Sequence, residues 1–83
     1  MTNTKLLEEY IDSSGYKRSY IASRLGITRY TLTKKINNVT EFLPSEIYVL
    51  CELLNIKDPK LRDLIFFNQN VGKTGTDDAI LNK

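Results

Sequence analysis

The segment from Gly26 to Asn38, GITRYTLTKKINN, gathers the side chains best suited to binding chemistry. Its charged residues are all basic, and its polar residues are Thr and Asn, which both donate and accept hydrogen bonds. Leu32 and Ile36 are four residues apart, so one side of a helix here would pack into a core. The segment is either an ordinary solvated helix or a surface that contacts an acidic partner.

The distribution of charge favours the second interpretation. The chain has 83 residues and a net charge of only +2. Residues 13–40, however, contain six basic side chains and no acidic one, whereas the rest of the chain contains six basic and ten acidic side chains. A basic middle in an otherwise acidic chain indicates one face with a polyanionic partner.

The composition argues against an enzyme. The sequence has no histidine, which removes Ser-His-Asp and Cys-His catalysis and His-containing zinc sites. Cys51 is the only cysteine and lies in an apolar helical pattern, so we expect it to be a buried core residue. The run VGKTGT resembles the end of a phosphate-binding loop, but Phe67 stands where the first glycine belongs. We therefore expect no catalytic residue, metal or cofactor.

The apolar spacing is helical almost throughout, so the sequence predicts an all-α bundle of four to five helices. Gly15 and Gly26 are expected to end helices, Thr28 to cap one, and Asp58 with Pro59 to begin the last. The expected helices span residues 4–14, 17–25, 29–36, 44–54 and 59–67. One domain is expected over residues 1–68, followed by a flexible tail over 69–83. No apolar run is long enough to cross a bilayer, so a cytoplasmic location is expected.

The second and third expected helices have the spacing of a helix-turn-helix. A small residue, Ala22, stands where the two helices would cross, and Gly26 follows four residues later to open the turn. Apolar residues then anchor both helices in the core, namely Ile21, Leu25, Ile27 and Leu32. This set within an acid-free basic span predicts a nucleic-acid-binding motif.

The stretch YKRSYIASRLGITRYTLTKKINN, followed by FLPSEIYVLCELLNI, resembles the phage repressor and Cro-like family, also called the XRE or lambda-repressor-like family. The resemblance covers about Leu6 to Phe67, and IASRLGIT with the following TL is its most specific part. It implies a five-helix DNA-binding domain that usually acts as a dimer on a pseudo-palindromic operator. Lys35 departs from the family, because many members have an aliphatic residue there. Such a lysine would extend its ammonium to the surface.

If the third helix enters the major groove, its outward residues reach base edges. The residues predicted to contact bases are Arg29, Tyr30, Thr33 and Lys34. The residues predicted to contact phosphates are Lys17, Arg18, Thr28, Lys35, Asn37 and Asn38. Arg24 is expected to form an ion pair with an acid of the first helix. Tyr16 and Tyr20 are expected to be core or staple residues.

The run LIFF, residues 64–67, has more apolar surface than a short terminal helix needs. We expect Leu64 and Phe67 to cap the core, and Ile65 and Phe66 to form a dimer interface. A two-fold dimer would place two recognition helices one DNA turn apart, about 34 Å.

The sequence therefore predicts a sequence-specific DNA-binding transcription regulator, a Cro-like repressor or genetic-switch protein that binds double-stranded DNA as a homodimer. The alternative is a protein-binding modulator, an antirepressor or antitoxin that uses the same fold to bind a partner repressor protein.

Overall fold

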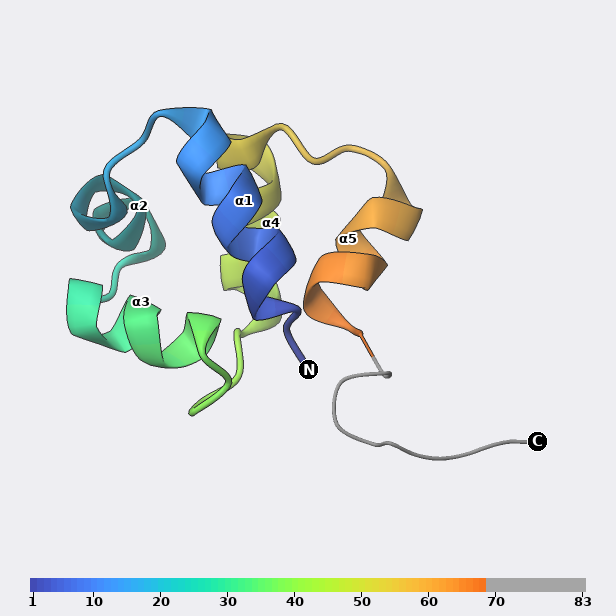
Figure 1. The fold of residues 1–83 in the computed structure, drawn as a ribbon. Helices are drawn as coiled ribbons and strands as arrows, with labels where there is room; N and C mark the ends of the chain where they lie inside the picture. The colour runs from blue at the N-terminus through green and yellow to red at the C-terminus, as the bar shows by residue number, and fades with distance from the viewer. Residues whose placement is uncertain (69–83) are drawn as a thin grey trace.

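The computed structural model of the chain describes residues 1–68, which fold into five α-helices (Figure 1). The helices are α1 (Thr4–Ser14), α2 (Arg18–Leu25), α3 (Arg29–Ile36), α4 (Pro44–Leu54) and α5 (Pro59–Phe66). The predicted all-α fold is confirmed, and the predicted bounds differ only at the start of α2 and at the end of α5. The tail predicted over residues 69–83 lies outside the described residues.

Side-chain caps begin three of the helices. The side chains of Asn3, Thr28 and Asp58 accept hydrogen bonds from backbone N–H groups in the first turns of α1, α3 and α5. These N–H groups have no partner within the helix, so each cap removes an unsatisfied donor. The first turn of α4 is satisfied differently, because Glu46 Oε1 accepts a hydrogen bond of 2.8 Å from the N–H of Leu43.

Residues with positive φ end the helices sharply. Gly26 follows α2 with φ 74°, and its N–H donates to the carbonyl of Ser23. The N–H of Ile27 donates to the carbonyl of Ala22, which completes a Schellman motif. Asn38 and Asn55 adopt the same left-handed conformation after α3 and α4, with φ of 66° and 60°. These left-handed residues let the chain change direction within a few residues of the end of these helices.

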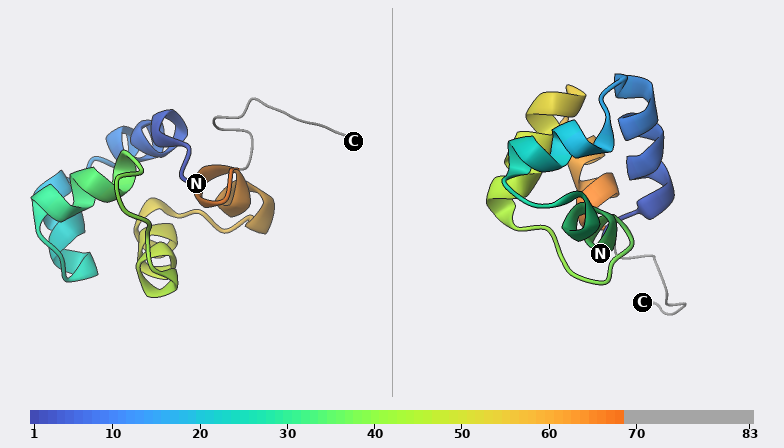
Figure 2. Two further views of the ribbon diagram at one scale, coloured as in Figure 1. Left: turned by 90° about the horizontal axis from the view of Figure 1, so that it is seen from below. Right: turned by 90° about the vertical axis from the view of Figure 1, so that its left-hand side faces the viewer.

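The core lies where α1 crosses in front of α4, with α2 and α3 on one side of this pair and α5 on the other (Figures 1 and 2). Each helix contributes one apolar stripe, and the largest fully buried side chains are Leu7, Ile11, Ile21, Leu32, Ile36, Leu50 and Ile65. Cys51 is only half-buried, on the edge of this core, so the expectation that it is a buried core residue is wrong.

The first residues of the chain connect the ends of α3 and α5. The N–H of Thr2 donates to Asn38 Oδ1, and Asn38 Nδ2 donates back to the carbonyl of Thr2, both at 2.8 Å. The N–H of Asn3 donates to the carbonyl of Ile65 at 2.6 Å. Thr2 itself is buried. This segment therefore fixes the C-terminal ends of two helices that do not follow each other in sequence.

The orientation of α5 is the opposite of the predicted one. Ile65 and Phe66 are buried, and the Phe66 ring packs edge-on against Phe42 with centroids 5.7 Å apart. Leu64 and Phe67, which were expected to cap the core, are 58% and 50% exposed. The prediction that Ile65 and Phe66 form a dimer interface is therefore wrong, because their side chains are already used inside one copy.

Within residues 1–68, the structure contains no helix that is both long and apolar enough to cross a membrane.

We expect Gly26→Ala to destabilise the domain by about 1–2 kcal/mol, because an L-residue at positive φ brings its Cβ close to the backbone. A Cβ added at Gly26 meets no atom within 4 Å, so the cost comes from backbone conformation and not from a clash. Urea denaturation measures the change. Gly26→Asn is the matched control and should cost less, since Asn38 and Asn55 adopt this conformation in the same protein. Equal costs for the two variants would contradict this explanation.

Candidate nucleic-acid interface

Helices α2 and α3 form a helix-turn-helix, joined by residues 26–28. Ala22 is 2% exposed on the inner side of α2, and Leu32 anchors α3 in the core with no exposed surface. Ala22 is small and buried, and α2 and α3 pack against each other, as the sequence spacing predicted. The turn orients α3 so that one of its sides faces the core and the other faces outward.

The outward side of α3 carries two pairs of residues at i, i+4 spacing. Arg29 and Thr33 form the first pair, in which the Thr33 hydroxyl donates to the carbonyl of Arg29 at 3.1 Å. Tyr30 and Lys34 form the second, with the Lys34 ammonium 5.3 Å from the centroid of the Tyr30 ring. Tyr30 is 73% exposed, Arg29 and Thr33 are exposed, and Lys34 is half-buried. All four residues predicted to contact bases therefore share one accessible surface.

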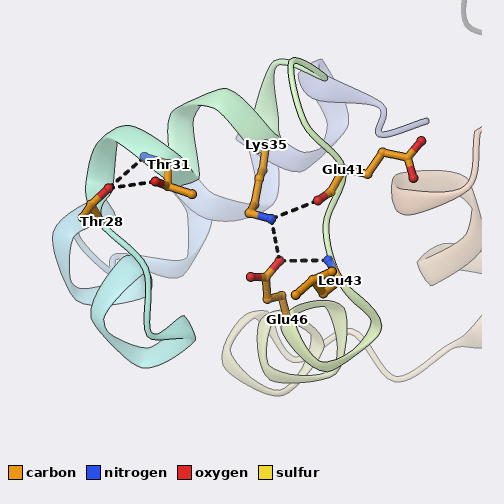
Figure 3. Close-up of polar contacts among 6 residues, drawn as sticks. All are labelled: Thr28, Thr31, Lys35, Glu41, Leu43 and Glu46. Carbon is orange, nitrogen blue, oxygen red and sulfur yellow. Dashed lines mark hydrogen bonds and ion pairs between the residues drawn. The ribbon is translucent and has the colours of Figure 1, made fainter.

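Thr28 fixes the start of this helix. Its Oγ1 accepts from the N–H of Thr31 at 3.1 Å and donates to the Thr31 hydroxyl at 2.9 Å (Figure 3). Thr28 itself stays exposed. The cap holds the first turn of α3, including Arg29, in one backbone conformation.

The start of α2 contributes two more basic residues. Lys17 is exposed at the N-cap, and Arg18 forms an ion pair with Glu8 of α1 at 3.7 Å. The ion pair with α1 that was predicted for Arg24 is thus made by Arg18 instead. Because the Glu8 side chain is 43% exposed, this pair is weak and solvent-screened.

Arg24 instead lies against an exposed aromatic pair. Its guanidinium donates to the Tyr20 hydroxyl at 3.1 Å and lies 6.0 Å from the centroid of the Tyr20 ring. The ring of Tyr20 is 5.1 Å from that of Tyr16, and both side chains are more than 40% exposed. Neither tyrosine therefore belongs to the core, so that half of the expectation is wrong, whereas the contact between the two rings at the start of α2 agrees with the alternative of a staple.

Lys35 points away from solvent and into the space between α3 and α4. Its ammonium lies 3.1 Å from Glu46 Oε1 and donates to the carbonyl of Glu41 at 2.9 Å (Figure 3). The Lys35 and Glu46 side chains are only 10% and 8% exposed. The prediction that Lys35 contacts a phosphate is therefore wrong, because its charge is neutralised inside the domain.

Asn38 is also used internally. Both polar atoms of its side-chain amide bind the backbone of Thr2, and its own backbone is left-handed. The prediction that Asn38 contacts a phosphate is therefore wrong, because its side-chain amide, like the Lys35 ammonium, is already bound inside the domain. Asn37, one residue earlier, is exposed.

Apart from Arg18, the basic residues that remain on the surface of α2, of its N-cap and of α3 form no ion pair in the described part of the chain. Within residues 1–68, no carboxylate forms an ion pair with Lys17, Arg29 or Lys34. The same residues contain no group of three or more His, Cys, Asp or Glu side chains that could hold a metal ion. The exposed side of the motif therefore presents unneutralised positive charge beside hydroxyl, amide and aromatic groups.

Comparison with known proteins agrees with this geometry. Residues 3–38, which span α1 to α3, match a family model described as "Bacterial regulatory protein, Fis family", a helix-turn-helix DNA-binding domain. The chain carries a helix-turn-helix DNA-binding domain. The match covers less than half of the chain, and it names a different helix-turn-helix family from the phage repressors that the sequence resembles. No curated protein and no solved structure matches the chain.

The sequence analysis did not identify Glu46, which pairs with Lys35 and so links α3 to α4. Two signals pointed to it. Lys35 stands at a position where phage repressor and Cro-like proteins usually have an aliphatic residue, so burying the lysine there would require an acidic partner. Glu46 lies in the first turn of α4, immediately before the buried Ile47, so it borders the core side of that helix.

We expect Lys35→Ala to destabilise the domain by about 3–5 kcal/mol, because Glu46 would remain as a buried charge without its partner. Thermal or urea unfolding measures this loss, which is large beside the stability of a small domain. The double variant Lys35→Met with Glu46→Gln is the control. It removes both charges and keeps an oxygen acceptor for the Leu43 N–H, so we expect most of the stability to return. If the double variant were as unstable as Lys35→Ala, the unpaired charge would not be the cause.

Proposed function

We propose that the protein is a sequence-specific DNA-binding transcription regulator of the compact phage-repressor or Cro type. In this proposal α3 enters the major groove of double-stranded DNA, and two copies bind a pseudo-palindromic operator. The observation that carries the proposal is the outward side of α3, where four accessible side chains suited to base edges lie together without an acidic neighbour.

Direct readout would come from these four side chains. Arg29, in the first turn of α3, has the donor geometry to bind guanine O6 and N7 together, which is worth about 1–3 kcal/mol of discrimination. Tyr30 offers a ring edge to a thymine methyl group. Lys34 donates to guanine or to a phosphate. Thr33 presents its methyl group to thymine, because its hydroxyl hydrogen is already donated to the carbonyl of Arg29.

Phosphate contacts would come from the rim of the same surface. We assign them to Lys17 and Arg18 at the start of α2, Thr28 at the cap of α3, and Asn37 at its end. Helix N-termini favour phosphate because backbone N–H groups and the helix dipole point at it. The ion pair between Arg18 and Glu8 is long and partly exposed, so the arginine can exchange it for a phosphate at little cost.

We expect DNA binding to weaken steeply with salt. Each neutralised phosphate contributes about −0.9 to the slope of log K against log salt, so Lys17→Ala should reduce the slope by about one contact. Mobility shifts on the promoter that flanks the gene, at several salt concentrations, measure this. Lys60→Ala is the matched control, because Lys60 is exposed on α5, away from α3. A wild-type protein that shifts no DNA at low salt would contradict the proposal and favour the alternative, a modulator that binds a partner protein.

We expect Arg29→Ala to relax the preference at one base pair of each half-site by about 1–3 kcal/mol, while binding to unrelated DNA changes less. Competition among operator variants that differ at single positions gives this measurement. Thr31→Ala serves as a control on the same helix, since Thr31 is half-buried. The variant loses the hydroxyl that accepts from Thr28 but keeps the backbone N–H that the Thr28 side chain caps. An unchanged base preference in Arg29→Ala would exclude Arg29 from base readout.

A further inference from the structure

A groove of about 630 Å³ lies between α4 and α5. Its walls come from both helices and from the connection between them, residues 55–58. From α4, a stripe at helical spacing faces the groove and includes Pro44, Tyr48 and Cys51. Phe67 closes the wall on the side of α5. Thus α4 has two apolar sides, one buried in the core and one lining this groove.

Two large aromatic side chains of the groove are open to solvent. Tyr48 is 68% exposed and Phe67 is 50% exposed, although both are large. The gap exists because α5 packs against α1 and not along α4. Exposed aromatic side chains of this kind, bordered by polar residues, are the residue types that protein–protein contacts favour.

The charges around the groove are balanced. Glu52 and Asp58 are acidic, whereas Lys57 and Arg62 are basic, and all four are exposed residues that line it. In a two-fold contact the same surface meets itself, so it must be self-complementary in charge. A neutral border with both signs meets this condition, because acids of one copy can face bases of the other. The surface formed by α2 and α3 is not self-complementary in charge, since its excess of positive charge would repel an identical copy.

We infer that this groove is the contact surface between two copies of the chain, with Tyr48 and Phe67 of each copy packed into the groove of the other. The choice of a second copy rests in part on the proposed function, because a two-fold operator requires two copies. The position of the groove agrees with that role. Helices α3 and α5 lie on opposite sides of the α1 and α4 pair, so the contact leaves both recognition helices free (Figures 1 and 2).

Sedimentation of matched variants tests the inference. We expect wild type to associate into dimers as concentration rises toward about 0.5 mM, and Tyr48→Glu and Phe67→Asp to raise the dissociation constant at least about tenfold. Both side chains are largely exposed, so the variants should keep the thermal unfolding temperature of wild type. Leu64→Asp is the matched control. Leu64 is an equally exposed apolar residue on α5, but it does not line the groove, and its change should leave association unaltered.

The outcomes separate clearly. Loss of association in the two groove variants, with retention in Leu64→Asp, supports the inference. A wild type that stays monomeric at about 0.5 mM, or association that Leu64→Asp abolishes and the groove variants retain, overturns it. A partner of another kind in the groove would give the first of these negative results.

Cys51 provides a second readout, because it lines the groove and is the only cysteine in the sequence. Burial raises the pKa of its thiol, so alkylation is best followed at mildly alkaline pH. We expect the alkylation rate of wild type to fall as protein concentration rises, and that of Phe67→Asp to stay constant. A rate independent of concentration in a wild type that dimerises would place the interface elsewhere.

Failure of this inference is distinguishable from failure of the proposed function. At high protein concentration Phe67→Asp should still bind a single half-site, with a base preference that depends on Arg29. If half-site binding depends on Arg29 while wild type never dimerises, only the groove inference fails. If Arg29 does not affect half-site binding while the groove variants do abolish dimers, the assignment of Arg29 to base readout fails and the inference stands.

Discussion

The position of α3 depends on one buried ion pair. The Lys35 ammonium is held between Glu46 Oε1 and the carbonyl of Glu41, while the same Glu46 oxygen accepts the Leu43 N–H (Figure 3). Burying two charges is costly, and the cost is offset only when both are paired and hydrogen-bonded. Here the pair joins the last turn of α3 to the first turn of α4. Together with the buried Leu32 and Ile36, it therefore fixes the rotation of α3 about its own axis, and with it the direction in which Arg29 and Tyr30 point.

The helices themselves were predictable because their signals are local. Thr28, Asp58 and Pro44 mark helix starts through capping and backbone geometry, and Gly26 marks a stop through its positive φ. The outward side of α3 was predictable for the same reason, since Leu32 and Ile36 define the inward side four residues apart. Each of these features depends only on residues that are close together in the sequence, so the sequence alone is enough to predict them.

The errors arose where the outcome depends on contacts between distant residues. Lys35 and Asn38 look like surface residues by type, and only Glu46 and Thr2, supplied from elsewhere in the chain, make their burial favourable. In the run LIFF all four residues are apolar, so type alone does not say which of them face inward. The hydrogen bond from Asn3 to Ile65 and the Phe42 ring decide that orientation.

The ion pair also connects the proposed DNA surface to the proposed contact between copies. Glu46 lies in the first turn of α4, and the neighbouring Pro44 and Ile47 line the groove toward α5. The path from one recognition helix to the two-fold axis would then pass through packed helices and a buried charge pair, with no flexible linker in between. Packed interiors deform little, so such a dimer would hold its two recognition helices at a nearly fixed separation. The distance between the two recognition helices would then set the spacing of the operator half-sites. If that spacing changed by a few base pairs, only one of the two copies could keep its contacts with DNA.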